Sequence, residues 1–223
     1  MKRPLKNKSG PPAPEFREPH APMVVTRVVL EGEHVRLEPL EMEHHAALCE
    51  VALDEELWRW IPTPLETPGD VVAYIETALG WQEEGTALPF VIVEKSSKTV
   101  VGSTRFANID RSHRHLEVGW TWLARPWQRT AVNTECKYLL LRHAFEQLGC
   151  IRVEFKTDAL NLRSRAALAR IGATEEGMSR NHMITSSGRI RHSVWFSIID
   201  SEWPQVKEHF ESRLTRQTKN IKD

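Results

Sequence analysis

The sequence has little that would tie the chain to a membrane, to nucleic acid or to a disulfide framework. Thirty basic and thirty acidic residues cancel among 223 residues, so no global field attracts nucleic acid or an anionic surface. No apolar run approaches the roughly 20 residues of a membrane span. Three cysteines without a C-x-x-C pair favour buried thiols in a reducing compartment. We therefore expect a cytoplasmic protein with no nucleic-acid or membrane partner.

The sequence also gives no reason to expect a metal site. The chain has ten histidines, of which His44 and His45 are adjacent on an expected helix and so point about 100° apart. His113 and His115 are spaced to share one face of a strand. Neither pair is accompanied by a carboxylate or cysteine set that would complete a ligand sphere, so we expect no metal.

The two ends of the chain differ from its middle. Residues 1–22 are rich in proline and charge and poor in apolar residues, a composition that predicts a flexible extension. Residues 23–214 carry the strand and helix patterns of a single domain. Residues 215–223 are expected to be a polar C-terminal tail.

Strand and helix patterns mix along the middle of the chain, with a β–α–β–α stretch in its second half. This order predicts an α/β or α+β sandwich around a mixed sheet. Glycines that follow the apolar pattern are expected to end two helices, at Gly149 and Gly172. The strands are expected at residues 34–40, at 90–109 as a hairpin around Lys-Ser-Ser-Lys, at 115–123, at 151–159, and at 178–184 with 190–199. The helices are expected at residues 43–52, 70–84, 132–148 and 162–171, and after Ser201.

The second half of the chain resembles a known family. The strand "HLEVGWTWLARPW", the loop "QRTAVN", the long helix, the strand "IRVEFKTDA" and then "NLRSRAALARIGA" are similar to the core of the GNAT superfamily of N-acetyltransferases. The similarity is strongest to the RimJ/RimL branch, and it covers roughly residues 30–214. It implies a mixed, mostly antiparallel sheet that is splayed between two central strands, helices on both faces, and acetyl-CoA (coenzyme A) as the co-substrate.

The loop at residues 128–133 is the expected phosphate site, although it contains no glycine. The family pattern is Gln/Arg-x-x-Gly-x-Gly/Ala, in which Gln128 fits and Ala131 replaces a glycine. Backbone amides at a helix start make such a site, so alanine serves if its φ stays negative. A plain capped turn is the alternative. By resemblance, the residues expected to bind the cofactor are Trp122, Leu123, Gln128, Arg129 (whose guanidinium can itself reach a phosphate), Thr130, Ala131, Val132, Asn133, Asn161 and Ser164.

Acetyl transfer requires a neutral amine, so a general base is expected. The resemblance points to Glu117, eleven residues before Gln128, and to Glu176 in "TEEG", and it leaves the choice open. Strand alternation places Glu117 on one face with Gly119 and Thr121, and places Trp120 and Trp122 on the other face.

The leaving thiolate is expected to receive help from a serine. Many family members carry a tyrosine at the position of Leu168, which has no proton to donate. Ser164 matches a serine that has this role in the RimL branch. Asn161 is expected to hold the pantetheine amide, to cap the helix that follows, or both.

The acceptor is the least determined part. The resemblance places Trp58, Trp60 and Glu117 beside it. We expect an acetyl-CoA-dependent N-acetyltransferase in which a primary amine attacks the thioester directly. The amine belongs either to a protein N-terminus or to a small molecule such as a polyamine, an amino acid or an aminoglycoside. The alternative is a non-catalytic acyl-CoA-binding or regulatory module, and a homodimer remains open.

Overall fold

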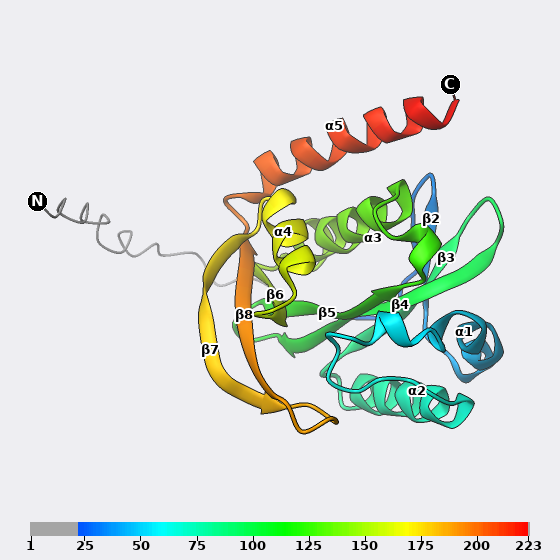
Figure 1. Cartoon of the computed structure of the whole chain (residues 1–223). Helices are drawn as coiled ribbons and strands as arrows, with labels where there is room; N and C mark the ends of the chain where they lie inside the picture. The colour runs from blue at the N-terminus through cyan, green and yellow to red at the C-terminus, as the bar shows by residue number, and fades with distance from the viewer. Residues whose placement is uncertain (1–21, 223) are drawn as a thin grey trace, which may run out of the picture.

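The computed structural model describes residues 22–222, so the expected extension at residues 1–22 lies outside the described part except for its last residue. Within the described range, eight strands form one sheet in the order β1-β2-β3-β4-β5-β6-β8-β7 (Figure 1). The single parallel contact joins β5 to β6, which confirms the mostly antiparallel mixed sheet. The strands are β1 (Leu30–Glu31), β2 (Val35–Pro39), β3 (Leu88–Glu94), β4 (Thr99–Asp110), β5 (His115–Leu123), β6 (Arg152–Asp158), β7 (Thr174–Ile184) and β8 (Ile190–Ile199).

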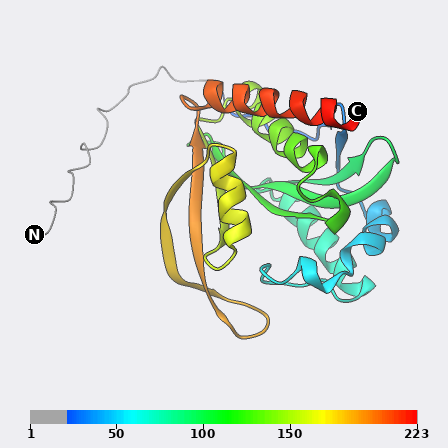
Figure 2. The ribbon, with the colours of Figure 1, turned by 45° about the horizontal axis from the view of Figure 1, so that its top comes forward.

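Helices cover both faces of the sheet. The helices α3, α4 and α5 lie on one face, and α1 and α2 lie on the other (Figures 1 and 2). Each face has its own apolar core, which packs Val118 of β5 with Leu139 of α3 on one side and Trp122 of β5 with Ile75 of α2 on the other. The α-helices of the described part are α1 (His45–Ala52), α2 (Pro68–Glu83), α3 (Ala131–Arg142), α4 (Leu162–Arg170) and α5 (Trp203–Lys222), and the shorter helical turns are η1 (Met42–His44), η2 (Glu55–Leu57), η3 (Arg125–Trp127) and the π-type η4 (His143–Gln147).

Several ends of elements follow the local sequence. Gly149 and Gly172 adopt φ values of +64° and +92° after their helices, which confirms both predicted stops. The Thr67 hydroxyl accepts a hydrogen bond from the Asp70 amide at the start of α2. Helix α5 continues to Lys222, so most of the expected polar tail is helical. None of the helices within residues 22–222 is long and apolar enough to cross a membrane.

Strands β5 and β6 separate after a short contact. Their parallel pairing runs from His115 opposite Arg152 only to Glu117 opposite Glu154. Beyond that point β5 continues to Leu123 and stays paired with β4, while β6 stays paired with β8. The sheet is therefore splayed between its two central strands, as the family resemblance implies, and Glu117 lies at the vertex of the wedge.

A β-bulge bends β5 just after the vertex. Its pairing with β4 goes from Arg105 opposite Gly119 to Ser103 opposite Trp122, with one residue more on β5. Trp120 provides that extra residue and has φ +48°, a left-handed conformation that is uncommon for a bulky residue.

The bulge changes which side chains share a face. Trp120 lies over the Lys156 ammonium, which in turn bonds Glu117, so Trp120 and Glu117 lie on the same side of the sheet. The Thr121 hydroxyl bonds that of Thr104 at 2.7 Å, and Thr104 faces away from that side. The prediction that Glu117 shares a face with Thr121 and not with Trp120 is therefore wrong, because strict alternation holds only without a bulge.

A buried carboxylate fixes the first strands against α3. The Glu135 oxygens accept hydrogen bonds from the backbone amides of Glu33, His34 and Val35, at 2.7–2.8 Å. Gly32 is required at this turn, since a Cβ there would lie 2.3 Å from the Glu135 carboxyl carbon. The β1–β2 turn thus depends on one side chain about a hundred residues away.

We predict that Glu135→Gln lowers the free energy of unfolding by about 3 kcal/mol, because the amide group cannot accept three charge-assisted hydrogen bonds. Urea denaturation of the purified protein measures the change. The exposed Glu50 of α1 provides a matched control, and Glu50→Gln should change stability by less than about 0.5 kcal/mol. Equal effects of the two substitutions would contradict the structural role of Glu135.

Candidate functional site

The loop after β5 leads directly into α3. Arg129 is exposed and has φ +66°, in the left-handed region that favours glycine. Thr130 is the extended N-cap, and Ala131 is the first helical residue, so its φ is negative as the phosphate-site hypothesis requires. Arg129 therefore lies at a position whose backbone conformation favours glycine.

The start of α3 presents a row of amides. The first hydrogen bond of the helix runs from the Thr134 amide to the Thr130 carbonyl, at 3.3 Å. The amides of Thr130, Ala131, Val132 and Asn133 precede it and point out of the helix N-terminus, where the helix dipole is positive. This arrangement can bind a phosphate group without any glycine.

Gln128 links the end of β5 to α4. Its side-chain amide donates to the Leu123 carbonyl at 2.8 Å, and its oxygen accepts from Arg163 of α4 at 3.3 Å. The end of β5 is thus linked to the start of α4 through one side chain. Arg163 thus provides a positive charge at this link.

Asn161 and Ser164 occupy the first turn of α4. The Asn161 side-chain oxygen accepts from the Ser164 amide at 3.0 Å, which confirms the N-cap interpretation of Asn161. Ser164 is half-buried, whereas Leu168 is buried in the core. The cap uses the Ser164 backbone amide and leaves its hydroxyl available for another partner.

Glu117 is a buried carboxylate with one oxygen in use. It is 2% exposed, and its Oε2 accepts from Asn108 at 2.8 Å and from Lys156 at 3.2 Å. Its Oε1 lies 2.8 Å from the place that a Cβ on Gly119 would occupy. Glycine at position 119 therefore leaves room for this oxygen at the vertex of the wedge.

Sequence reasoning missed Asn108 and Lys156. Alternation along β6 places Lys156 on the same face as Glu154, but only the register between β5 and β6 brings it to Glu117. The Lys156 ammonium also lies 5.7 Å from the Trp120 ring centroid and 5.0 Å from that of Trp195. An internal cation therefore occupies the aromatic space beside Glu117.

Glu176 is held by an ion pair. Its two oxygens accept from the Arg152 guanidinium at 2.6 and 2.5 Å, and one also accepts from the Ser197 hydroxyl. The Arg152 hydrogen bonds, more than the opposing effect of burial, lower the pKa of Glu176. Both of its oxygens are thus engaged, in contrast to the free Oε1 of Glu117.

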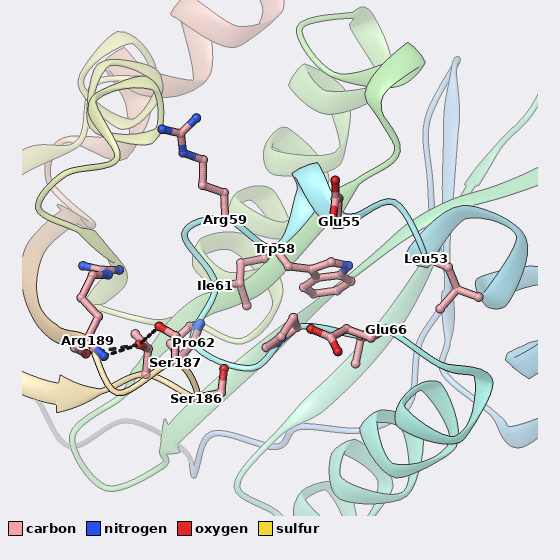
Figure 3. A pocket seen from close by; sticks show the side chains of 13 residues that line it. Leu53, Glu55, Trp58, Arg59, Ile61, Pro62, Glu66, Ser186, Ser187 and Arg189 are labelled. Carbon is pink, nitrogen blue, oxygen red and sulfur yellow. Dashed lines mark hydrogen bonds between the residues drawn. The ribbon is translucent and has the colours of Figure 1, made fainter.

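The segment between α1 and α2, which includes η2, and the β7–β8 hairpin line a pocket (Figure 3). The Ser186 amide donates to the Pro62 carbonyl at 3.1 Å, which joins the hairpin to the loop before α2. Trp58 lines this pocket, but the residue is only 5% exposed and its ring packs against that of Trp122. Trp60 is half-buried and lies over Arg189 of the hairpin.

Arg189 is anchored by the end of β6. Its guanidinium donates to the Asp158 carboxylate at 2.5 Å, and the buried Arg191 lies 3.8 Å from the same oxygen. His192 faces elsewhere, since its ring accepts from the Asn181 amide at 2.8 Å. His192 therefore contacts the β7 strand of the hairpin.

The histidine pair at residues 113 and 115 does have a carboxylate nearby. Asp110 lies 2.9 Å from His113 Nδ1 and 3.7 Å from His115 Nε2, and ligand atoms of the three residues lie within 4.8 Å of one another. The reason given for expecting no metal is therefore wrong at this turn. The same carboxylate accepts from the His113 amide and the Ser112 hydroxyl, which are the hydrogen bonds of an ordinary turn.

One cysteine contacts a histidine. Cys49 Sγ lies 3.3 Å from His45 Nε2, one turn apart on α1. Burial raises the pKa of the Cys49 thiol, which is the opposite of what an activated nucleophile needs. Cys49 is partly exposed, and Cys136 and Cys150 are buried in the core, so the described thiols offer no covalent intermediate at the wedge.

Comparison with known proteins agrees with this geometry. The model of the family described as "Acetyltransferase (GNAT) domain" matches residues 34–174. The chain belongs to the GNAT family. It is an N-acetyltransferase of the acyltransferase class. YdaF of Bacillus subtilis (strain 168), which is named for ribosomal N-acetyltransferase activity, is 27% identical over 79% of this chain and 97% of its own length.

Solved structures show the same architecture. A protein from T. thermophilus described as an acetyltransferase is 37% identical, covers 86% of this chain and 100% of its own, and has a TM-score of 0.78. RimJ of Mycobacterium smegmatis, solved in complex with CoA-disulfide, is 24% identical over 80% of this chain and 88% of its own, with a TM-score of 0.70. These two likenesses show the fold of the family, and the similarity to YdaF supports its RimJ/RimL-like branch.

We predict that Arg129→Gly stabilises the protein by about 1 kcal/mol relative to Arg129→Ala, because only glycine adopts φ +66° without a steric penalty. Both variants lack the guanidinium, so they serve as matched controls for each other in denaturant melts. If the two unfold at the same denaturant concentration, the left-handed conformation carries no penalty in solution.

The ion pair of Glu176 should stabilise the fold only when the carboxylate is charged. The folded-state pKa of Glu176 lies below the ordinary glutamate pKa. The ion pair therefore contributes its full stability above the ordinary pKa, and this stability is lost as the pH falls through the folded-state pKa. We predict that Glu176→Gln lowers the free energy of unfolding at pH 7 by less than about 1 kcal/mol, since the site is partly exposed. The difference should shrink as the pH falls from the ordinary glutamate pKa of about 4.3 through the lowered one. Urea melts at pH 7 and at successively lower pH values measure it, and a difference that does not shrink in acid would contradict the prediction.

Proposed function

We propose that the enzyme transfers an acetyl group from acetyl-CoA to a primary amine by direct attack, with Glu117 as the general base. One observation carries the proposal. The pairing of β5 with β6 ends at the buried Glu117, whose Oε1 is free at the vertex of the wedge. A thioester that lies along β5 places its carbonyl carbon beside that oxygen.

Three features support the placement of the donor. The free edge of β5 beyond the vertex offers the backbone of Trp122 and Leu123 to the pantetheine arm. The amides of residues 129–133 suit its pyrophosphate, and Asn161 suits its amide from the opposite wall. Each role of these residues is part of the proposal.

The amine nitrogen attacks the thioester carbonyl carbon, so an N–C bond forms and the C–S bond breaks. Glu117 Oε1 takes the proton that the amine loses, directly or through one water molecule. A backbone amide of β5 after the bulge donates to the oxygen of the tetrahedral intermediate. The Ser164 hydroxyl donates a proton to the leaving thiolate and is replenished from solvent.

Glu117 is preferred to Glu176 as the base for a geometric reason. A general base needs a free oxygen within hydrogen-bond reach of the amine. Both oxygens of Glu176 are held by Arg152 and Ser197, and its lowered pKa makes it a weaker proton acceptor. Glu176 is therefore assigned to holding β7 against β6 and β8.

The acceptor enters from the side of Trp60 and the β7–β8 hairpin. The name of the relative YdaF favours a ribosomal protein N-terminus, and a small-molecule amine fits the same chemistry. Resemblance of fold does not choose between them.

The first test separates catalysis from binding alone. Acetyl-CoA should raise the melting temperature, and a mixture of primary amines should then cause release of free thiol. Stabilisation by acetyl-CoA without turnover of any amine would favour a non-catalytic acyl-CoA-binding module. The absence of any stabilisation would contradict both functions.

We predict that Glu117→Gln lowers kcat about 100-fold or more and removes from the pH–rate profile the limb that reports ionisation of the base, since the amide cannot accept the proton. Gly119→Ala should lower kcat as well, because its methyl group collides with Oε1. Glu176→Gln is the matched control and should leave kcat within about twofold. If Glu176→Gln is the more damaging change, the assignment of the base is wrong.

A further inference from the structure

Arg105 is a fully buried cation next to the vertex of the wedge. Its side chain is 0% exposed and points from β4 toward α2. The guanidinium carbon lies 4.7 Å from the ring centroid of Tyr74, 5.4 Å from that of Trp81 and 5.3 Å from that of Trp120. Three aromatic rings from two elements thus surround one positive charge.

This charge has no oxygen partner. All three side-chain nitrogens of Arg105 lack a hydrogen bond within the described part of the chain. Aromatic faces attract the cation but supply no acceptor in the plane of its N–H groups. A buried guanidinium without an acceptor is costly, so its presence calls for an explanation.

The neighbouring carboxylates are already committed. Lys156 pairs with Glu117, and Arg189 and Arg191 share Asp158. Arg105 forms none of these ion pairs. The missing acceptor therefore has to come from outside this group of charges.

The position of Arg105 indicates which ligand would supply it. Arg105 pairs with Gly119 in the sheet, and Gly119 is also the residue against which Glu117 Oε1 lies. The phosphates of the donor belong at the start of α3, beyond Leu123 at the other end of the wedge. An anionic group at Arg105 would thus belong to the acceptor and lie a few bonds from the reacting amine.

We propose that the acceptor carries a carboxylate close to its primary amine and that Arg105 binds this carboxylate. The planar guanidinium matches a carboxylate through two parallel N–H donors. The inference rests on the proposed acetyl transfer and narrows its acceptor. It excludes polyamines and aminoglycosides, which bring only further positive charge to a buried cation. The carboxylate can be that of a free amino acid or an acidic side chain near a peptide N-terminus.

Access requires only side-chain movement. Trp81 and Trp120 cover Arg105 as an edge-to-face pair with ring centroids 5.3 Å apart, and both are half-buried rather than enclosed. Rotation of one indole would expose the N–H edge of the guanidinium, and rotamer changes of this size are common when ligands bind.

Isosteric acceptor pairs test the proposal. Thiol release from acetyl-CoA is measured with γ-aminobutyrate against γ-aminobutyramide, and with the amidated peptide Ser-Asp-Ala against Ser-Asn-Ala. The carboxylate member of at least one pair should have a kcat/KM about tenfold or more above that of its amide. The first pair reports a free amino acid and the second an acidic peptide. Equal rates within both pairs would overturn the proposal.

Variants of Arg105 identify the residue responsible. Arg105→Met keeps the volume without the charge and should reduce the preference to about twofold or less. Arg105→Lys should restore part of the preference. Arg170→Gln, at an exposed arginine near the end of α4, is the control and should keep the preference. A preference that survives Arg105→Met would overturn the assignment.

A binding measurement distinguishes this inference from the proposed function. Melting temperatures are compared for the enzyme saturated with free CoA, with and without each carboxylate and amide. Stabilisation by a carboxylate that is absent in Arg105→Met supports the inference even if no amine is acetylated, in which case only the proposed catalysis fails. Without thiol release, equal stabilisation by both members of each pair would overturn the inference.

Discussion

The site depends on one constraint, which is that β5 and β6 can be paired for only three residues. A parallel pair normally continues as long as both strands do, because each unpaired backbone group loses a hydrogen bond. Here the bulge at Trp120 bends β5 away immediately after Glu117. The free edge of β5, the buried carboxylate at the vertex and the space between the strands all follow from that bend.

The wedge stays open because each of its walls is fixed by its other neighbour. Strand β6 is paired with β8 along its whole length, and Asp158 at its end holds Arg189 and Arg191 of the hairpin. Strand β5 is held by β4 up to Leu123. Gln128 then spans the gap between the end of β5 and α4. A ligand can enter such a preformed space without the cost of separating two strands.

Sequence patterns were sufficient for the features that depend on neighbours in the chain. The hairpins, the long helix that leads to Gly149 and the cap at Asn161 are local, and the family resemblance added the splay. The bulge was not predictable, because it is a slip of register between two strands and Trp120 is not a residue type that favours φ +48°. The left-handed conformation of Arg129 was not predictable either, because arginine is not a residue type that favours φ +66°. The three-ring enclosure of Arg105 joins residues from α2 and β5 that only the tertiary fold brings together.

The balance of charge at the wedge differs from that of the whole chain. The sequence has equal numbers of acidic and basic residues, but the wedge does not. Arg105 and Lys156 lie near Glu117, and Asp158 forms ion pairs with two arginines. Glu117 keeps Oε1 free because Lys156 and Asn108 both bind Oε2. Under the proposed mechanism, the positive charge of Arg105 and Lys156 would disfavour a cationic acceptor. The proposed acceptor would offset the charge of Arg105 with its own carboxylate and place its amine at Glu117.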